Sequence, residues 1–176
     1  MQCINGGGLL SLHFKSIIMI QRIQTVYLAL ASIALIVLYF FPLASYLSEL
    51  SYSKLYLTHL ASLTPGVEPV VKNSVVLPLA IFNGIIALIG LVSVFVYKKR
   101  PLQSKIVKLC ILMTIIMIVL VFFVYAPLIS RLTATEAVFT DGYGLYLILL
   151  AIVMFVLANR AIIKDEKLVR SADRLR

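Results

Sequence analysis

Four long runs without a charged residue constrain this chain more than any other feature of its sequence. They cover residues 23–48, 73–97, 109–130 and 142–159. A helix needs about 20 mostly apolar residues to cross the hydrocarbon core of a bilayer. Strands buried in a soluble protein can be as rich in Val and Ile, but they run only about 4–8 residues. The runs therefore predict four transmembrane helices, at about residues 25–47, 75–97, 107–129 and 142–160.

The composition supports the same conclusion. Hydrophobic residues make up 62% of the 176-residue chain and charged residues 13%, against about 45–50% and about 25% in soluble domains. So few charges cannot cover the surface of a soluble protein of this size. The first run is also longer than the roughly 7–15 apolar residues of a signal peptide, so we expect a retained anchor. The expected fold is an all-α membrane protein with four antiparallel transmembrane helices.

The first 18 residues do not resemble the rest of the chain. The segment MQCINGGGLLSLHFKSII contains three consecutive glycines and little pattern, whereas MIQRIQTVYLAL, from Met19, reads as a complete start with a short polar lead. We expect Met19 to be the native initiator and residues 1–18 to be a non-native or disordered extension. The alternative is a genuine but poorly ordered N-terminal tail. The membrane domain then covers residues 19–176.

Basic residues predict the orientation of the chain. Of the 16 Lys and Arg residues, 13 fall in the N-terminal lead, in the segment 98–108 or after residue 159. Loops that stay in the cytoplasm carry an excess of Lys and Arg, so both termini are predicted to be cytoplasmic. This requires an even number of crossings, and four fits. The first outer loop contains SYSKLYLTHL, whose partial two-residue alternation is a weak strand signal.

Few side chains point to chemistry. The four apolar runs contain no charged residue, and Asn83 is the most polar side chain deep in a span. It is either a contact for a substrate or ion, or an interhelical hydrogen-bonding group beside Gly84, where small residues let helices approach closely; we favour the second interpretation. No Ser-His-Asp, Cys-His or paired-carboxylate set is visible, and the two cysteines and two histidines are not at metal-ligand spacing. We expect no catalytic residue, metal or cofactor.

The C-terminal segment RAIIKDEKLVRSADRLR is the most informative polar stretch. We expect a juxtamembrane helix over residues 160–176, continuing from the fourth span. Its basic residues, Lys164, Lys167, Arg170 and Arg174 among them, either contact anionic lipid or an acidic partner, or act only as a basic flank that sets the topology. We favour the plain flank. Nucleic acid is not an expected partner, because no readout motif accompanies the charge.

The two ends of the membrane domain resemble a known family. MIQRIQTVYL, residues 19–28, and LANRAIIKDEKLVRSADRLR, residues 157–176, are similar to the ends of small bacterial inner-membrane proteins that are classed only as a domain of unknown function. The closing motif is the more specific of the two. The resemblance implies four helices in a bacterial cytoplasmic membrane, no assigned activity and no catalytic residues.

These features favour a non-enzymatic membrane component, either a scaffold or an accessory subunit of a membrane assembly. Its expected partners are the lipid bilayer, including anionic headgroups, and another membrane protein or further copies of the chain. The alternative is a small oligomeric transporter or channel for an uncharged or weakly polar solute. An enzyme acting on lipid ranks third, because it would need an outer acid such as Glu136 or Asp141 to face another polar group.

Overall fold

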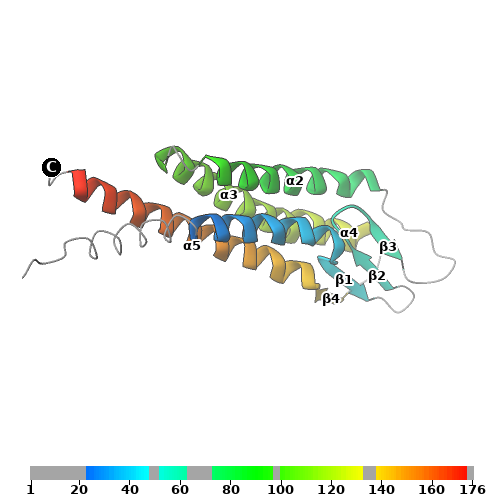
Figure 1. Ribbon diagram of the computed structural model, residues 1–176. Helices are drawn as coiled ribbons and strands as arrows, with labels where there is room; N and C mark the ends of the chain where they lie inside the picture. Colours follow the sequence, from blue (N-terminus) through cyan, green and yellow to red (C-terminus); the bar gives the residue numbers. More distant parts are fainter. Residues whose placement is uncertain (1–22, 48–51, 63–72, 97–99, 133–137, 174–176) are drawn as a thin grey trace, which may run out of the picture.

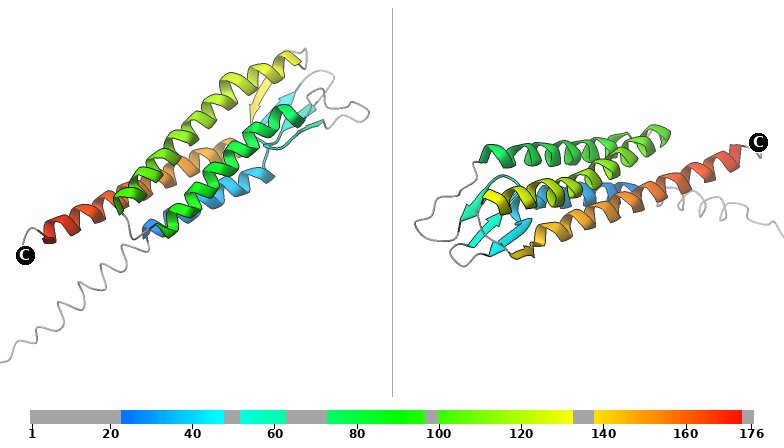
Figure 2. Two further views of the ribbon diagram at one scale, coloured as in Figure 1. Left: turned by 90° about the horizontal axis from the view of Figure 1, so that it is seen from above. Right: turned by 180° about the vertical axis from the view of Figure 1, so that it is seen from behind.

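The fold is a bundle of four long helices with a small sheet at one end and the end of α5 at the other (Figures 1 and 2). The computed structural model describes residues 23–47, 52–62, 73–96, 100–132 and 138–173. Residues 1–22 lie outside this description, and with them the predictions about Met19 and the 1–18 extension. The prediction of four membrane-crossing helices is confirmed, since four are long and apolar enough: Ile23–Phe40, Asn73–Phe95, Pro101–Arg131 and Tyr143–Val169.

The first helix, Ile23–Phe40, is shorter than the predicted span of about 25–47. Its last turn, Leu38–Phe40 (η1), is 3-10 helix, and Phe41 is extended. Proline lacks a backbone N–H and disfavours helical backbone at the residue before it, so Pro42 ends the helix here. The predicted span extended beyond Pro42 because the prediction relied on apolar composition alone. Residues Ala44–Leu47 form strand β1 instead.

The third helix is continuous but irregular. It comprises α3 (Arg100–Leu120), a π-helical segment η2 (Val121–Tyr125) and α4 (Ala126–Leu132). The N–H of Ala126 bonds to the carbonyl of Val121, five residues back. The next residue is Pro127, whose ring would clash with a carbonyl four residues back in a regular helix. The wider turn lies directly before this proline.

Helix α3 begins before the predicted span of about 107–129. Lys105 was expected in the loop ahead of this span, yet α3 already begins at Arg100. Lys, Arg and Gln are good helix formers, and long basic side chains can keep their charge in water while their stems lie along apolar surface. The hydrocarbon boundary therefore does not end the helix. Helix α5 (Tyr143–Asp173) likewise runs 31 residues without a break, through the predicted fourth span and into the expected tail helix.

A four-stranded antiparallel sheet joins segments that are far apart in sequence. Its order is β3 (Leu60–Ser62), β2 (Tyr52–Leu55), β1 and β4 (Val138–Asp141). In β1, Ala44 is opposite both Leu55 of β2 and Asp141 of β4. Because β4 directly precedes α5, the sheet fixes the start of α5 beside the end of the first helix. The alternation expected for the first outer loop is confirmed in β2, where buried and half-buried residues alternate.

The sheet corrects the expectation of an all-α fold. Two of its strands were not predicted from the sequence. Strand β1 lies within the apolar run that was assigned to the first span, and β4 lies in a segment that was predicted to be a short loop. A strand only four residues long has no diagnostic pattern until its partner is known. The remaining predicted span, about 75–97, corresponds closely to α2 (Asn73–Phe95).

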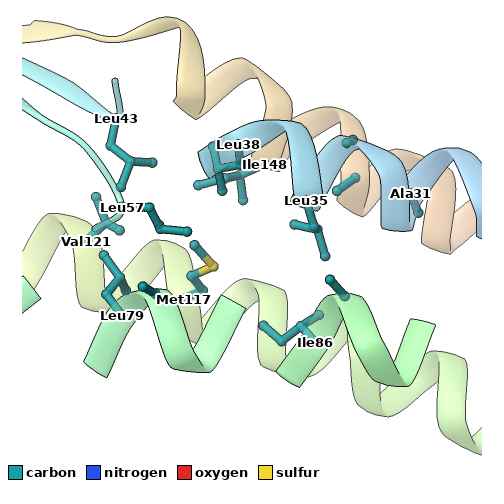
Figure 3. Close-up of a cluster of buried hydrophobic side chains, with 14 of the residues drawn as sticks. Ala31, Leu35, Leu38, Leu43, Leu57, Leu79, Ile86, Met117, Val121 and Ile148 are labelled. Atoms are coloured by element: carbon teal, nitrogen blue, oxygen red, sulfur yellow. The ribbon is translucent and has the colours of Figure 1, made fainter. Parts of the chain in front are cut away.

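The core runs along the inside of the bundle and closes against the sheet end. Figure 3 shows large aliphatic side chains from the first helix, α2, α3 and α5 meeting there. Leu43 and Leu57, from the segments around the sheet, fill the end of this core and are fully buried. The apolar interior is thus continuous from the helices to the sheet.

Candidate functional site

Five hydrogen bonds between helices form the most distinctive polar feature of the interior. Asn83 of α2 is fully buried, and its Nδ2 donates to the carbonyl of Leu35 in the first helix at 2.9 Å. Nearer the sheet, the Tyr39 hydroxyl of the first helix donates to the carbonyl of Ala80 in α2 at 2.6 Å. Two polar contacts therefore join the first helix to α2.

The other three bonds connect the remaining neighbours. Gln103 Nε2 of α3 donates to the carbonyl of Ser93 in α2 at 3.0 Å. Ser104 Oγ donates to Asn159 Oδ1 of α5 at 3.0 Å, and Gln24 Nε2 of the first helix donates to the carbonyl of Ala161 in α5 at 3.1 Å.

Together the five bonds link the four helices in a closed ring: first helix to α2, α2 to α3, α3 to α5, and α5 back to the first helix. Polar side chains commonly hydrogen-bond between helices in this way inside membranes. The ring holds four helices whose apolar sides alone would not select one partner over lipid.

Three buried polar atoms are left over from this ring. Asn83 Oδ1, Ser93 Oγ and Gln103 Oε1 have no hydrogen-bond partner within the described part of the chain. Gln103 and Ser93 lie at the same junction, because the Gln103 amide bonds to the Ser93 carbonyl. A buried polar group without a partner costs free energy, so each of these atoms offsets part of the stabilisation that the ring contributes.

Three helices approach one another closely at Gly90 of α2. A Cβ atom built there would lie 2.6 Å from Ser32 Oγ of the first helix and 3.2 Å from Phe155 Cζ of α5. The absence of a side chain at Gly90 therefore leaves room for Ser32 and Phe155 where three helices meet. Helix α2 also has a shallow apolar groove on its outward side, around Pro78, with Ser74, Leu77, Ile81, Phe82 and Ile85.

The predicted tail residues fall into two groups. Lys164 and Lys167 are exposed on α5, as are Lys105 and Lys108 on α3. Arg170 lies in α5, but its side chain is outside the described residues, and Arg174 is outside them altogether.

Asp165, which is only 3% exposed, did not stand out in the sequence. It continues the buried stripe of α5 formed by Ala151, Phe155, Ala158 and Ile162. This three- and four-residue spacing is the signal that could have identified it.

The sheet end holds one buried phenol outside the spans. Tyr46 of β1 is only 3% exposed, and burial raises the pKa of its hydroxyl to about 12, because an apolar environment disfavours the charged form. Nearby, His59 stacks on Tyr56, with ring centroids 4.9 Å apart, and shares a 2.9 Å hydrogen bond with Thr58 Oγ1. Among the residues that the structure describes, no group of three His, Cys, Asp or Glu side chains could hold a metal ion.

Four apolar helices, tied together by their own polar groups, define a multi-pass membrane protein. The chain belongs to the family described as Domain of unknown function (DUF4293), which matches residues 20–175. This confirms the expected membership of an uncharacterised domain family. The comparison with the curated proteins gives no match, and neither does the comparison with the solved structures.

Proposed function

We propose that the chain resides in the bacterial cytoplasmic membrane, with four helices crossing in alternate directions and both termini in the cytoplasm. Support comes from the distribution of charge. Lys105 and Lys108 of α3 are exposed, and the Ser104–Asn159 bond brings them to the end of the bundle where α5 carries its own basic residues. The sheet lies at the other end (Figure 2). By the positive-inside rule the sheet end is extracytoplasmic.

Reporter fusions test this topology. Fusions after Lys99 and after Arg176 should report the cytoplasm, and a fusion after Pro65 should report the outer side. The proposed alternation is wrong if the fusions after Pro65 and Lys99 report the same compartment.

Within this membrane we propose a non-enzymatic role, as a scaffold or accessory subunit of a membrane assembly. The observation that supports it best is the ring of interhelical hydrogen bonds. The donor groups of the ring are hydrogen-bonded to neighbouring helices. Such bonds favour a rigid bundle, as a scaffold requires. The surfaces left for recognition are the basic end, the sheet and the apolar outer faces, all of which suit contacts with other molecules.

Site-specific photo-crosslinking in native membranes tests the scaffold role. A photoreactive residue at Ile81, in the α2 groove, probes one outer face, and one at Val153, exposed on α5, is the matched control on another. A scaffold should give an adduct of defined mass from some faces and not from others. Adducts with lipid alone from every outer position would contradict the proposal.

The alternative is a small oligomeric transporter or channel for an uncharged or weakly polar solute. The three unpartnered atoms of Asn83, Ser93 and Gln103 favour it, because they would solvate such a guest. Thiol accessibility separates the two functions. In a background with Cys3→Ser and Cys110→Ser, a Ser93→Cys thiol should resist a membrane-impermeant thiosulfonate in a scaffold. Rapid modification would show a water-filled path to Ser93 and favour transport.

A further inference from the structure

The exposed basic residues of α3 and α5 belong to one surface. The Ser104 Oγ–Asn159 Oδ1 bond fixes which turns of the two helices face each other. Successive residues of a helix are turned by about 100° around its axis. If α3 and α5 run in opposite directions, as proposed above, the residues that follow Ser104 and Asn159 therefore point to the same side of the helix pair. Those residues are Lys105 and Arg160. Both are exposed, and their levels along the helix axes differ by roughly 3 Å.

The same geometry assigns three further cations to this side. Lys108 lies three residues after Lys105, and Lys164 and Lys167 lie four and seven residues after Arg160, so each lies on the same helix face as the residue it follows. All three are exposed. We define the dibasic face as Lys105, Lys108, Arg160, Lys164 and Lys167.

Burial on the opposite side agrees with this assignment. Gln103, which precedes Ser104, should point away from the dibasic face, and its amide bonds to the carbonyl of Ser93 in α2. On α5, Ile162 is fully buried. The rest of the bundle therefore packs behind the α3–α5 pair and leaves the dibasic face free.

The carboxylates at this level are less exposed than the cations of the dibasic face. Asp165 is buried on the bundle side, and Glu166 is half-buried. Among the described residues of these turns, the exposed charges are all positive. A surface of this kind attracts anions.

We propose that the dibasic face is a binding site for the headgroup of an anionic phospholipid in the inner leaflet. Its occupant follows from charge complementarity and position. The cations lie where two apolar helices leave the hydrocarbon, with Lys108 the deepest, and lysine stems can lie along apolar surface while the ammonium reaches the headgroups. The Arg160 guanidinium matches a phosphate with two parallel donors. Basic pockets between transmembrane helices recognise anionic headgroups by this chemistry.

Native mass spectrometry of the full-length protein in detergent tests the proposal, with phosphatidylglycerol as the probe and phosphatidylcholine as the neutral comparison. Wild type should bind phosphatidylglycerol in preference. Lys105→Gln/Arg160→Gln should weaken this binding roughly 25-fold, since each charge near the surface is worth a factor of about five. The charge-conserving Lys105→Arg/Arg160→Lys should retain it.

Matched variants distinguish the site from bulk charge and from the tail alone. Lys54→Gln/Arg131→Gln removes two charges outside the face and should leave binding within about twofold of wild type. Lys105→Gln/Lys108→Gln and Lys164→Gln/Lys167→Gln should weaken binding alike. The two-helix site is overturned if wild type binds both lipids equally, if the Lys54/Arg131 control loses as much, or if only the α5 variant weakens. The reporter fusions test the underlying topology separately.

Discussion

Two close approaches, one at the sheet end and one in the middle of the bundle, show how differently the two regions are held together. At the sheet end, a Cβ on Gly142 would lie 2.2 Å from the carbonyl oxygen of Pro42 and 2.6 Å from the backbone carbon of Leu43. In the bundle, a Cβ on Gly90 would meet only side chains, Ser32 and Phe155. The first contact involves backbone atoms and the second involves atoms that can rotate or be removed.

The difference reflects what each region uses to specify its structure. The sheet end is a network of backbone hydrogen bonds: Gly142 N–H donates to the Leu43 carbonyl at 3.2 Å, and Gly144 N–H to the Pro42 carbonyl at 2.9 Å. The bundle has no backbone bonds between its helices to rely on, because each helix satisfies its own backbone. Its structure depends on side-chain size and on single polar contacts. A destabilising substitution in the bundle should therefore be compensated by a second substitution at a contacting side chain.

The largest effect should come from Gly142→Ala. The added methyl group meets backbone that is fixed from both sides, and we expect a loss of about 3 kcal/mol or more, at the upper end of overpacking costs. Unfolding can be followed in detergent by a maleimide fluorophore that reacts with buried Cys110, in a Cys3→Ser background. Gly84→Ala is the milder control, because its Cβ would meet only the Tyr39 hydroxyl at 3.0 Å. Equal melting of both variants would show that the sheet end is not the rigid region.

Gly90→Ala should cost about 1–3 kcal/mol, but a second change should repair it. Removing the Ser32 hydroxyl deletes the atom that lies 2.6 Å from the new Cβ and leaves the Phe155 ring, which can shift. The Ser32→Ala/Gly90→Ala variant should therefore recover at least about 1 kcal/mol relative to additivity in a double-mutant cycle. Additive losses would mean that the backbones of the helices, and not this side chain, limit their approach.

Asn83→Leu should have a small effect. It removes one interhelical hydrogen bond to the Leu35 carbonyl but also removes Oδ1, which has no partner in the described structure. Interhelical hydrogen bonds in membranes contribute about 0.6 kcal/mol on average, so we expect a loss below about 1 kcal/mol in the Cys110 assay. A loss several times larger, or a protein that no longer inserts, would show that the bundle depends on this one residue.

The last effect is absent at neutral pH and concerns Tyr46 at alkaline pH. Its folded pKa of about 12 lies above the value of about 10 for an exposed tyrosine. The folded state therefore favours the neutral phenol. This contribution is complete below about pH 10 and is lost as the pH rises through about 12. Wild type should lose more stability than Tyr46→Phe between these values, and the difference in phenolate absorbance should show one late-titrating group. Parallel stability curves would argue against a buried phenol.

The number of crossings was predictable because the signal is local. A run of apolar residues long enough to cross a bilayer has to satisfy its own backbone, and a helix does so within the run. Asn83 and the basic residues of α5 also stood out in the sequence, by polarity inside a span and by helical spacing. Family membership could be predicted as well, since it depends on residues in order along the chain.

The residues that contact one another within the fold could not be predicted in the same way. That Asn83 bonds to Leu35, that Gly90 lies against Ser32, and that β1 pairs with β4 nearly a hundred residues later are all decided by which surfaces meet. The sequence likewise placed Lys105 in a loop, although it lies in α3, directly after the Ser104 that bonds to Asn159 of α5. Local composition sets how each segment meets lipid and water, because that free energy is a property of the segment alone. The contacts that shape the ring, the sheet and the dibasic face are properties of pairs, and only the tertiary structure decided them.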